Sequence, residues 1–154
     1  MINSRKLEDL VPAVSSKAAA FLDACRAVDI DVLITSTFRD YDSQRELYAQ
    51  GRTKPGKIVT NANAGYSMHN FRCAFDVVPL RFGKPVWGTK GNGIDEDPTD
   101  DDKDDLELWQ RIGAIGESVG LEWGGNWTNF PDMPHFQFTS GLTMAQLRGG
   151  AKVV

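Results

Sequence analysis

The sequence has 154 residues, of which 41% are hydrophobic and 25% are charged, with a formal net charge of −4. This balance is typical of a globular protein, and we expect one domain over residues 1–154 that acts as a monomer. The sequence shows neither a basic face for nucleic acid nor an apolar run long enough to span a membrane, so neither is an expected partner. Residues 1–9 lack the apolar run of a secretory signal, which predicts synthesis in a cytoplasm.

The first part of the chain predicts a helix followed by a strand. Apolar residues recur at three- and four-residue steps over 6–28, which indicates a helix. Pro12 is unfavourable inside a helix, so either a short turn ends there or the main helix begins near it. The β-branched segment 31–37 is typical of a strand.

A second helix is expected over 43–50, with Asp42 as its N-cap and Gly51 at its end. Residues 51–66 are rich in Gly, Pro, Asn and Lys without periodicity, which predicts a long loop. Residues 73–80 form an apolar run that predicts a buried strand.

Pro79 is expected to end that buried strand, and residues 81–87 to return as a hairpin with Gly83 in its turn. An amphipathic helix is predicted from Leu106 to Val119, with Gly120 as its stop. A last strand over 135–138 and a short helix over 144–147 complete the pattern. The order of elements indicates an α+β fold, a small antiparallel sheet with helices packed on it.

The chain has two histidines, and each has a carboxylate close by in the sequence. His69 precedes Asp76, and His135 follows Asp132. Hydrolytic zinc sites often use three ligands from His, Asp and Glu and keep a fourth position for water. His69, Asp76 and His135 supply that number, which leaves Asp132 as a candidate base. Spacing alone leaves this open, because an isolated histidine is more often part of the core.

A zinc-bound water ionises near neutral pH, and a nearby carboxylate can carry its proton to the leaving amine. A fixed cation stabilises the oxyanion that forms. Arg39, which follows a predicted strand, is the candidate for that cation.

Three segments resemble one family of peptidases. Residues 67–76 resemble the motif S-x-H-x-x-G-x-A-x-D of the D-alanyl-D-alanine carboxypeptidase and L-alanyl-D-glutamate endopeptidase family. Residues 123–127 and 132–136 resemble its W-G-G-x-W and D-x-P-H-F motifs, and 35–53 resembles its strand-to-helix segment. The resemblance implies a zinc peptidase with the fold shared by the hedgehog signalling domain.

The resemblance also implies roles for individual residues. It makes His69, Asp76 and His135 ligands of one zinc ion and Asp132 the catalytic base. Arg39 is expected to hold the substrate carbonyl. The positions expected to line the substrate cleft are Gln44 and Ser67.

Arg72 stands where the family motif has glycine. If this position needs a positive φ, arginine is strained there by about 1 kcal/mol or more. The alternatives are a different turn, or a guanidinium that contacts carboxylates of the substrate.

Several aromatic and cysteine positions have two interpretations. Trp123 and Trp127 are candidates either for substrate contact or for core packing. Trp109 and Trp87 are expected to pack in the interior. The two cysteines, Cys25 and Cys73, are expected to be reduced and buried.

The acidic run 95–105 has two interpretations as well. Clustered carboxylates can bind a regulatory Ca²⁺, but the run lacks the spacing and central glycine of an EF-hand loop. A solvated loop that caps the following helix is the alternative.

The expected function is cleavage of the L-Ala–D-Glu bond in peptidoglycan stem peptides by a phage endolysin, which reaches the periplasm after release by a holin. One alternative is a D-Ala-D-Ala carboxypeptidase or dipeptidase of cell-wall metabolism. Another is a non-catalytic zinc-binding domain that recognises the wall, although such a domain has no need of Asp132 or Arg39.

Overall fold

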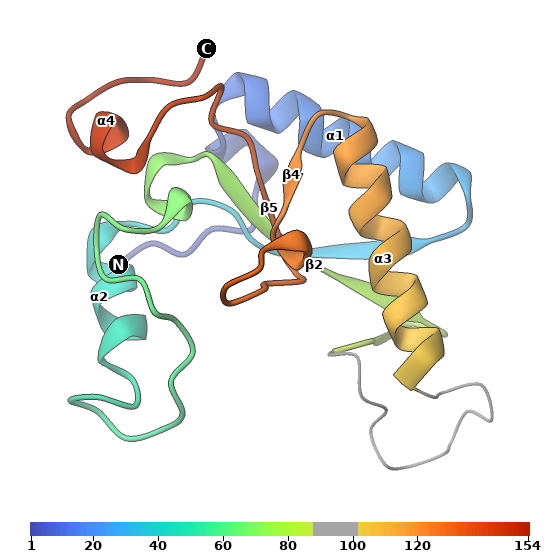
Figure 1. Ribbon diagram of the computed structural model, residues 1–154, viewed down its shortest axis with the longest axis horizontal. Helices are drawn as coiled ribbons and strands as arrows, with labels where there is room; N and C mark the ends of the chain where they lie inside the picture. Colours follow the sequence, from blue (N-terminus) through green and yellow to red (C-terminus); the bar gives the residue numbers. More distant parts are fainter. Residues whose placement is uncertain (88–101) are drawn as a thin grey trace.

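The computed structural model describes residues 1–87 and 102–154 (Figure 1). Its strands form one antiparallel sheet in the order β1-β2-β5-β4, with β3 paired to β2. This confirms the predicted α+β class. No helix in the described residues is long and apolar enough to cross a membrane. The strands are β1 (Asp31–Ser36), β2 (Ala74–Arg81), β3 (Lys84–Pro85), β4 (Glu122–Trp123) and β5 (His135–Gln137).

The helices agree with the sequence pattern, including the interruption at Pro12. Pro12 occupies the first turn of α1, where its missing N–H leaves no helical hydrogen bond unmade. The predicted helix 6–28 is therefore two elements. The helices are η1 (Leu7–Asp9), α1 (Pro12–Ala27), α2 (Tyr41–Ala49), η2 (Met68–Phe71), α3 (Asp102–Ser118), η3 (Gly124–Asn126) and α4 (Met144–Arg148).

The predicted N-cap of α2 is wrong by two residues. Asp40 caps the helix, because its Oδ1 accepts a hydrogen bond of 2.8 Å from the backbone N–H of Ser43. Asp42 lies inside the first turn, where it pairs with Arg45 at 2.7 Å. Both aspartates suit the positive end of the helix dipole, so sequence alone did not separate them.

Pro79 does not end β2, which continues to Arg81. The carbonyl of Pro79 accepts a hydrogen bond from Val86 on the β3 side. Since the nitrogen and carbonyl of one strand residue point to the same side, the missing N–H costs no bond to β1. Phe82 and Gly83 then form the predicted turn, both with positive φ.

The two faces of the sheet differ in character. Phe75 on β2 lies opposite Phe136 on β5, and the next pair along is Asp76 with His135. The phenyl rings face α1, where Phe21 contacts both of them. Because side chains alternate along a strand, Asp76 and His135 face the other side of the sheet, away from the packed core.

Helix α3 packs beside α1 and against β4 and β2 (Figure 1). A Cβ atom on Gly116 would lie 2.3 Å from the ring of Phe136, so only glycine permits this approach. Trp109 is fully buried, and both cysteines are free and buried, as predicted. The short strand β4 was not predicted, because two residues carry no readable alternation.

Candidate metal centre and cleft

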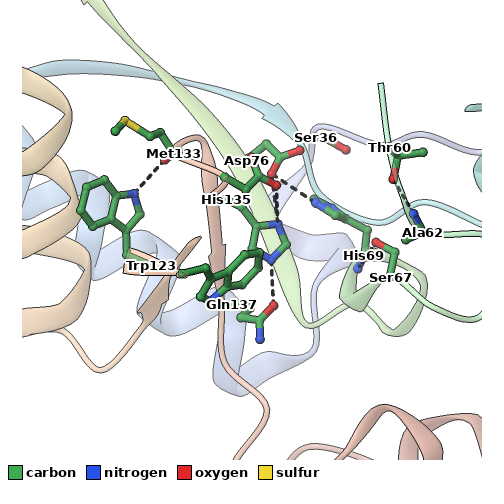
Figure 2. Close-up of polar contacts among 12 residues, drawn as sticks. Ser36, Thr60, Ala62, Ser67, His69, Asp76, Trp123, Met133, His135 and Gln137 are labelled. Atoms are coloured by element: carbon green, nitrogen blue, oxygen red, sulfur yellow. Dashed lines mark hydrogen bonds and ion pairs between the residues drawn. The ribbon is translucent and has the colours of Figure 1, made fainter. Parts of the chain in front are cut away.

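Three side chains from separate elements converge on the open face of the sheet (Figure 2). His69 comes from η2, whose N-cap is Ser67 with its hydroxyl accepting from the His69 N–H at 3.3 Å. Asp76 and His135 come from neighbouring positions of β2 and β5. Strand pairing therefore brings Asp76 and His135 together, and the short helix η2 adds His69.

The distances between these side chains fit a tetrahedral metal. Oδ1 of Asp76 lies 3.2 Å from Nε2 of His69 and 3.4 Å from Nδ1 of His135. All three donor atoms lie within 4.8 Å of one another. Tetrahedral zinc bonds of about 2.0–2.1 Å separate neighbouring donors by about 3.3 Å. The donor types and the spacing both suit zinc.

The outer nitrogen of each imidazole is held by an oxygen acceptor. Nδ1 of His69 lies 2.7 Å from the carbonyl oxygen of Thr37, and Nε2 of His135 lies 2.8 Å from Oε1 of Gln137. Each of these nitrogens must therefore carry the proton. When the rings are neutral, the lone pairs therefore lie on Nε2 of His69 and Nδ1 of His135, the two nitrogens that face Asp76.

Burial and the neighbouring charges shift the pKa values of Asp76 and His135 in opposite directions. Burial alone would raise the pKa of Asp76, but the charge and hydrogen bonds of His69 and His135 hold that pKa well below its usual range. Burial would likewise lower the pKa of His135, and the hydrogen bond and charge of Asp76 raise it instead. Asp76 is thus an ionised carboxylate, the form in which it can bind a metal.

Asp132 lies beside the three candidate ligands. A turn closed by the His135 N–H on the Asp132 carbonyl brings its Oδ2 within 3.9 Å of Nδ1 of His135. The side chain remains 49% exposed and lines the cavity. Partial burial raises the pKa of Asp132, which brings the carboxyl group closer to the range of a general base.

Arg39 lies at the edge of the cluster and is held by two side chains. Its Nη1 donates to Oε1 of Gln44 at 3.0 Å, and its Nη2 donates to Oγ of Ser36 at 3.2 Å. The same Nη2 lies 3.9 Å from Oδ2 of Asp76. Burial lowers the pKa of Arg39, although the guanidinium stays charged at any ordinary pH. Among the described residues, Arg39 is thus the fixed cation that lies beside the Asp76 carboxylate.

Gln44 does not line the cleft, contrary to the prediction. It is fully buried, and its Nε2 donates to the carbonyl of Ala62 at 2.6 Å. With both ends of the amide in use, Gln44 orients Arg39 and ties the loop before η2 to helix α2.

A cavity of about 420 Å³ opens over the cluster. Ser67 and Trp127 line it, as expected for substrate contact, and the Trp127 ring lies 5.1 Å from the His135 ring. Trp87 also lines it and is 59% exposed, so the prediction that Trp87 packs in the interior is wrong. The lining also includes Arg39, Asp132 and the three candidate ligands.

Trp123 belongs to the core, which favours packing over substrate contact among its two interpretations. Its side chain is 6% exposed, and its Nε1 donates to the carbonyl of Met133 at 2.8 Å (Figure 2). The ring fills the space over Gly113 and Gly125, where a Cβ atom would lie within 2.3 Å of it. Two glycines therefore accommodate this tryptophan between α3 and η3.

Arg72 adopts a left-handed conformation with φ 61°, as the glycine of the motif suggests. Its guanidinium lies 3.8 Å from the centroid of the Phe38 ring and donates to the Asp9 carbonyl at 2.9 Å. These contacts offset the backbone strain. They also direct the side chain away from the cavity, so a contact with substrate carboxylates is not supported.

Most of the acidic run 95–105 lies outside the described residues, and so does most of the proposed calcium site. Within the described part, Asp105 is buried and pairs with Arg81 at 2.6 Å. This carboxylate stabilises the contact between α3 and β2, and calcium binding has no support.

Two residues that hold the histidines were missed in the sequence. Gln137 follows His135 by two positions in β5, so the alternation of a strand already placed both on one face. Thr37 acts through its backbone carbonyl, which no side-chain pattern reveals.

Known proteins are similar to this chain over most of its length. A family described as D-alanyl-D-alanine carboxypeptidase matches residues 60–138. The peptidoglycan L-alanyl-D-glutamate endopeptidase CwlK of Bacillus subtilis (strain 168) is 38% identical over 130 residues, which cover 84% of this chain and 73% of CwlK. The L-alanyl-D-glutamate peptidase of Listeria phage A118 is 29% identical over 90% of this chain, which spans 40% of that protein.

Solved structures share the fold. The L-Ala D-Glu endopeptidase ChiX of Serratia marcescens superposes with a TM-score of 0.58 and 21% identity, over 86% of this chain and 83% of ChiX. A mutant of the vancomycin resistance D,D-pentapeptidase VanY, in complex with Zn(II), superposes with a TM-score of 0.54 and 14% identity, over 91% of this chain and 76% of VanY. The match to the family over 60–138 and the identity to CwlK show that the chain belongs to the D-alanyl-D-alanine carboxypeptidase family of peptidases.

Proposed function

We propose that this chain is a zinc-dependent endopeptidase that cleaves the L-Ala–D-Glu bond of peptidoglycan stem peptides. The observation that carries the proposal is the convergence of His69, Asp76 and His135 at donor distances that fit one zinc ion, with Asp132 beside them. CwlK and the phage peptidase, which are similar along most of the chain, bear the name of this activity.

The proposed ligands are Nε2 of His69, Nδ1 of His135 and a carboxylate oxygen of Asp76. When bound, zinc lowers the pKa of a water molecule and polarises the scissile carbonyl. The hydrogen bonds to Thr37 and Gln137 keep both imidazoles in the tautomers that this binding requires.

Asp132 is the proposed general base. It accepts a proton from the attacking water and returns it to the nitrogen of the leaving D-Glu. Its position in the cavity beside His135 suits this role, and its raised pKa makes it a better proton acceptor than an ordinary aspartate.

Arg39 is the proposed stabiliser of the negative charge that develops on the carbonyl oxygen. Gln44 and Ser36 fix its guanidinium, so little reorganisation accompanies the reaction. Ser67 and Trp127 line the cavity and are proposed to contact the stem peptide. Tyr66 and Trp87, both more than half exposed, extend the same lining.

The direct test is digestion of purified peptidoglycan with and without a chelator, followed by mass spectrometry of the released muropeptides. We expect new amino termini at D-Glu, loss of activity with the chelator and recovery with zinc. Cleavage only at terminal D-Ala would instead support a D,D-carboxypeptidase, which the description of the matched family favours as the second candidate.

We further propose that the enzyme acts as a phage endolysin on the host wall, as the Listeria phage relative suggests. Expression in a bacterium with and without a phage holin tests this role. Lysis that requires both proteins is expected, and lysis by the peptidase alone would contradict release through a holin.

A further inference from the structure

Glu122 on β4 lies outside the cavity lining but contacts two residues of that lining, Gln137 and Trp127. It lies opposite Gln137 in the sheet. Its Oε2 accepts from Nε2 of Gln137 at 2.9 Å and from the indole Nε1 of Trp127 at 3.1 Å. Gln137 in turn contacts His135, and Trp127 forms part of the cavity wall.

The direction of the Gln137 amide follows from these contacts. A carboxamide has a donor end and an acceptor end, whereas an ionised carboxylate can only accept. Glu122 therefore holds the NH₂ end of Gln137, which leaves Oε1 directed at Nε2 of His135. Nε2 must then donate, so in the neutral ring the lone pair lies on Nδ1, the nitrogen that faces Asp76.

We propose that Glu122 is a positioning residue that fixes His135 in its metal-binding tautomer through Gln137 and, independently, fixes the Trp127 side of the cleft. The inference rests on the proposed zinc site. A carboxylate outside the cavity thus controls both metal affinity and substrate affinity, through two different neighbours.

The contact with Gln137 should affect zinc affinity, whereas the contact with Trp127 should affect KM. Gln137→Leu removes the hydrogen-bond acceptor of His135, and we expect zinc affinity to fall about 10- to 100-fold, as when the hydrogen-bond partner of a metal ligand is lost. Trp127→Phe removes only the indole donor and part of the wall, so KM for the stem peptide should rise while zinc affinity stays within twofold. Glu122→Ala should produce both changes.

Zinc affinity is measured by competition with a chromophoric chelator, and KM with a soluble stem peptide. Glu117→Ala is the matched control, because Glu117 is exposed and accepts a single side-chain hydrogen bond, from Nδ2 of Asn126 at 2.8 Å. It should leave zinc affinity and KM unchanged.

The double variant Glu122→Ala/Gln137→Leu tests the route. If Glu122 acts on the metal through Gln137, the double variant binds zinc no more weakly than Gln137→Leu alone. The inference is overturned if Glu122→Ala keeps the zinc affinity of the unaltered protein, or if the two losses multiply. An unaltered protein that binds no zinc would instead contradict the proposed function.

Nitrogen-15 NMR gives a readout that does not depend on activity. With only two histidines in the chain, the ring signals are simple to assign. We expect neutral His135 to be protonated on Nε2 in the unaltered protein and on both nitrogens in exchange in Glu122→Ala. His69, anchored on Thr37, should keep its signal and shows that each variant is folded.

Discussion

His69 and His135 face the same oxygen of Asp76 through different ring nitrogens, Nε2 of His69 and Nδ1 of His135. The two rings are nearly perpendicular, at 73°, with centroids 5.2 Å apart. Each ring is anchored on its far side by an oxygen of the protein, so the protein itself sets the direction of both lone pairs.

His69→Ala and His135→Ala should each abolish zinc binding and activity together, because two remaining ligands hold zinc weakly. Metal content measured by atomic emission is expected to fall from about one zinc per chain to a small fraction. Full zinc stoichiometry in either variant would count against the ligand assignment. Circular dichroism provides the control for folding.

Asp132→Asn should retain zinc and lose activity. The amide keeps the shape of the side chain but cannot accept the proton of the attacking water, and we expect kcat to fall about 10²- to 10⁴-fold. Metal content and hydrolysis of the stem peptide are measured on the same preparation. Near-normal turnover with asparagine at this position would exclude Asp132 as the base.

Gln44→Leu should lower both stability and turnover. The substitution leaves Nη1 of Arg39 and the half-buried carbonyl of Ala62 without their partner, which costs about 1–3 kcal/mol of unfolding free energy. Denaturant unfolding measures this loss. Glu46→Ala, at an exposed position of the same helix, is the control and should change stability by less than about 0.5 kcal/mol.

Stability should fall as pH rises above about 8.5, the pKa of a thiol in an unfolded chain. Burial raises the pKa of Cys25 and of Cys73 to about 11 in the folded protein. Between these values the unfolded chain releases two protons that the folded protein keeps, so unfolding is favoured. The unfolding free energy of Cys25→Ala/Cys73→Ala should depend less steeply on pH over this window.

Arg72→Gly and Arg72→Ala should differ in stability. Both lose the contacts with Phe38 and Asp9, but glycine also removes the strain of a positive φ, worth about 1 kcal/mol or more. We therefore expect Arg72→Gly to be the more stable of the two in thermal unfolding. Equal melting temperatures would mean that alanine is not strained at this position.

The sequence predicted that His69, Asp76 and His135 lie together, because the segments that resemble the family contain these residue types in this order. The pairing of β2 with β5 places His135 next to Asp76, and neither motif indicates that these two strands pair. Trp123 and Trp127 could not be separated, since only the coordinates show which ring fills the space over Gly113 and Gly125.

Polar burial was the least predictable feature. Gln44 was expected in the cleft because of its position in the segment that resembles the family, and its complete burial depends on two partners that are 5 and 18 residues away in the sequence. For Trp87 the error was the opposite, because the sequence predicted burial and the side chain is exposed. Large apolar size favours burial, but this ring lies over a cavity that the chain leaves open.

Because side chains alternate along β2 and β5, the same register places the site residues on one face of the sheet and the core residues on the other. If β5 paired with β2 one position out of register, His135 would turn toward α1 and Phe136 would turn toward water, while Asp76 and Phe75 kept their faces. Burying the polar imidazole would cost several kcal/mol, and the packing of Phe136 on Phe75 and Phe21 would be lost at the same time. A folded form with these strands out of register would therefore be much less stable than the native fold, and the protein does not populate it.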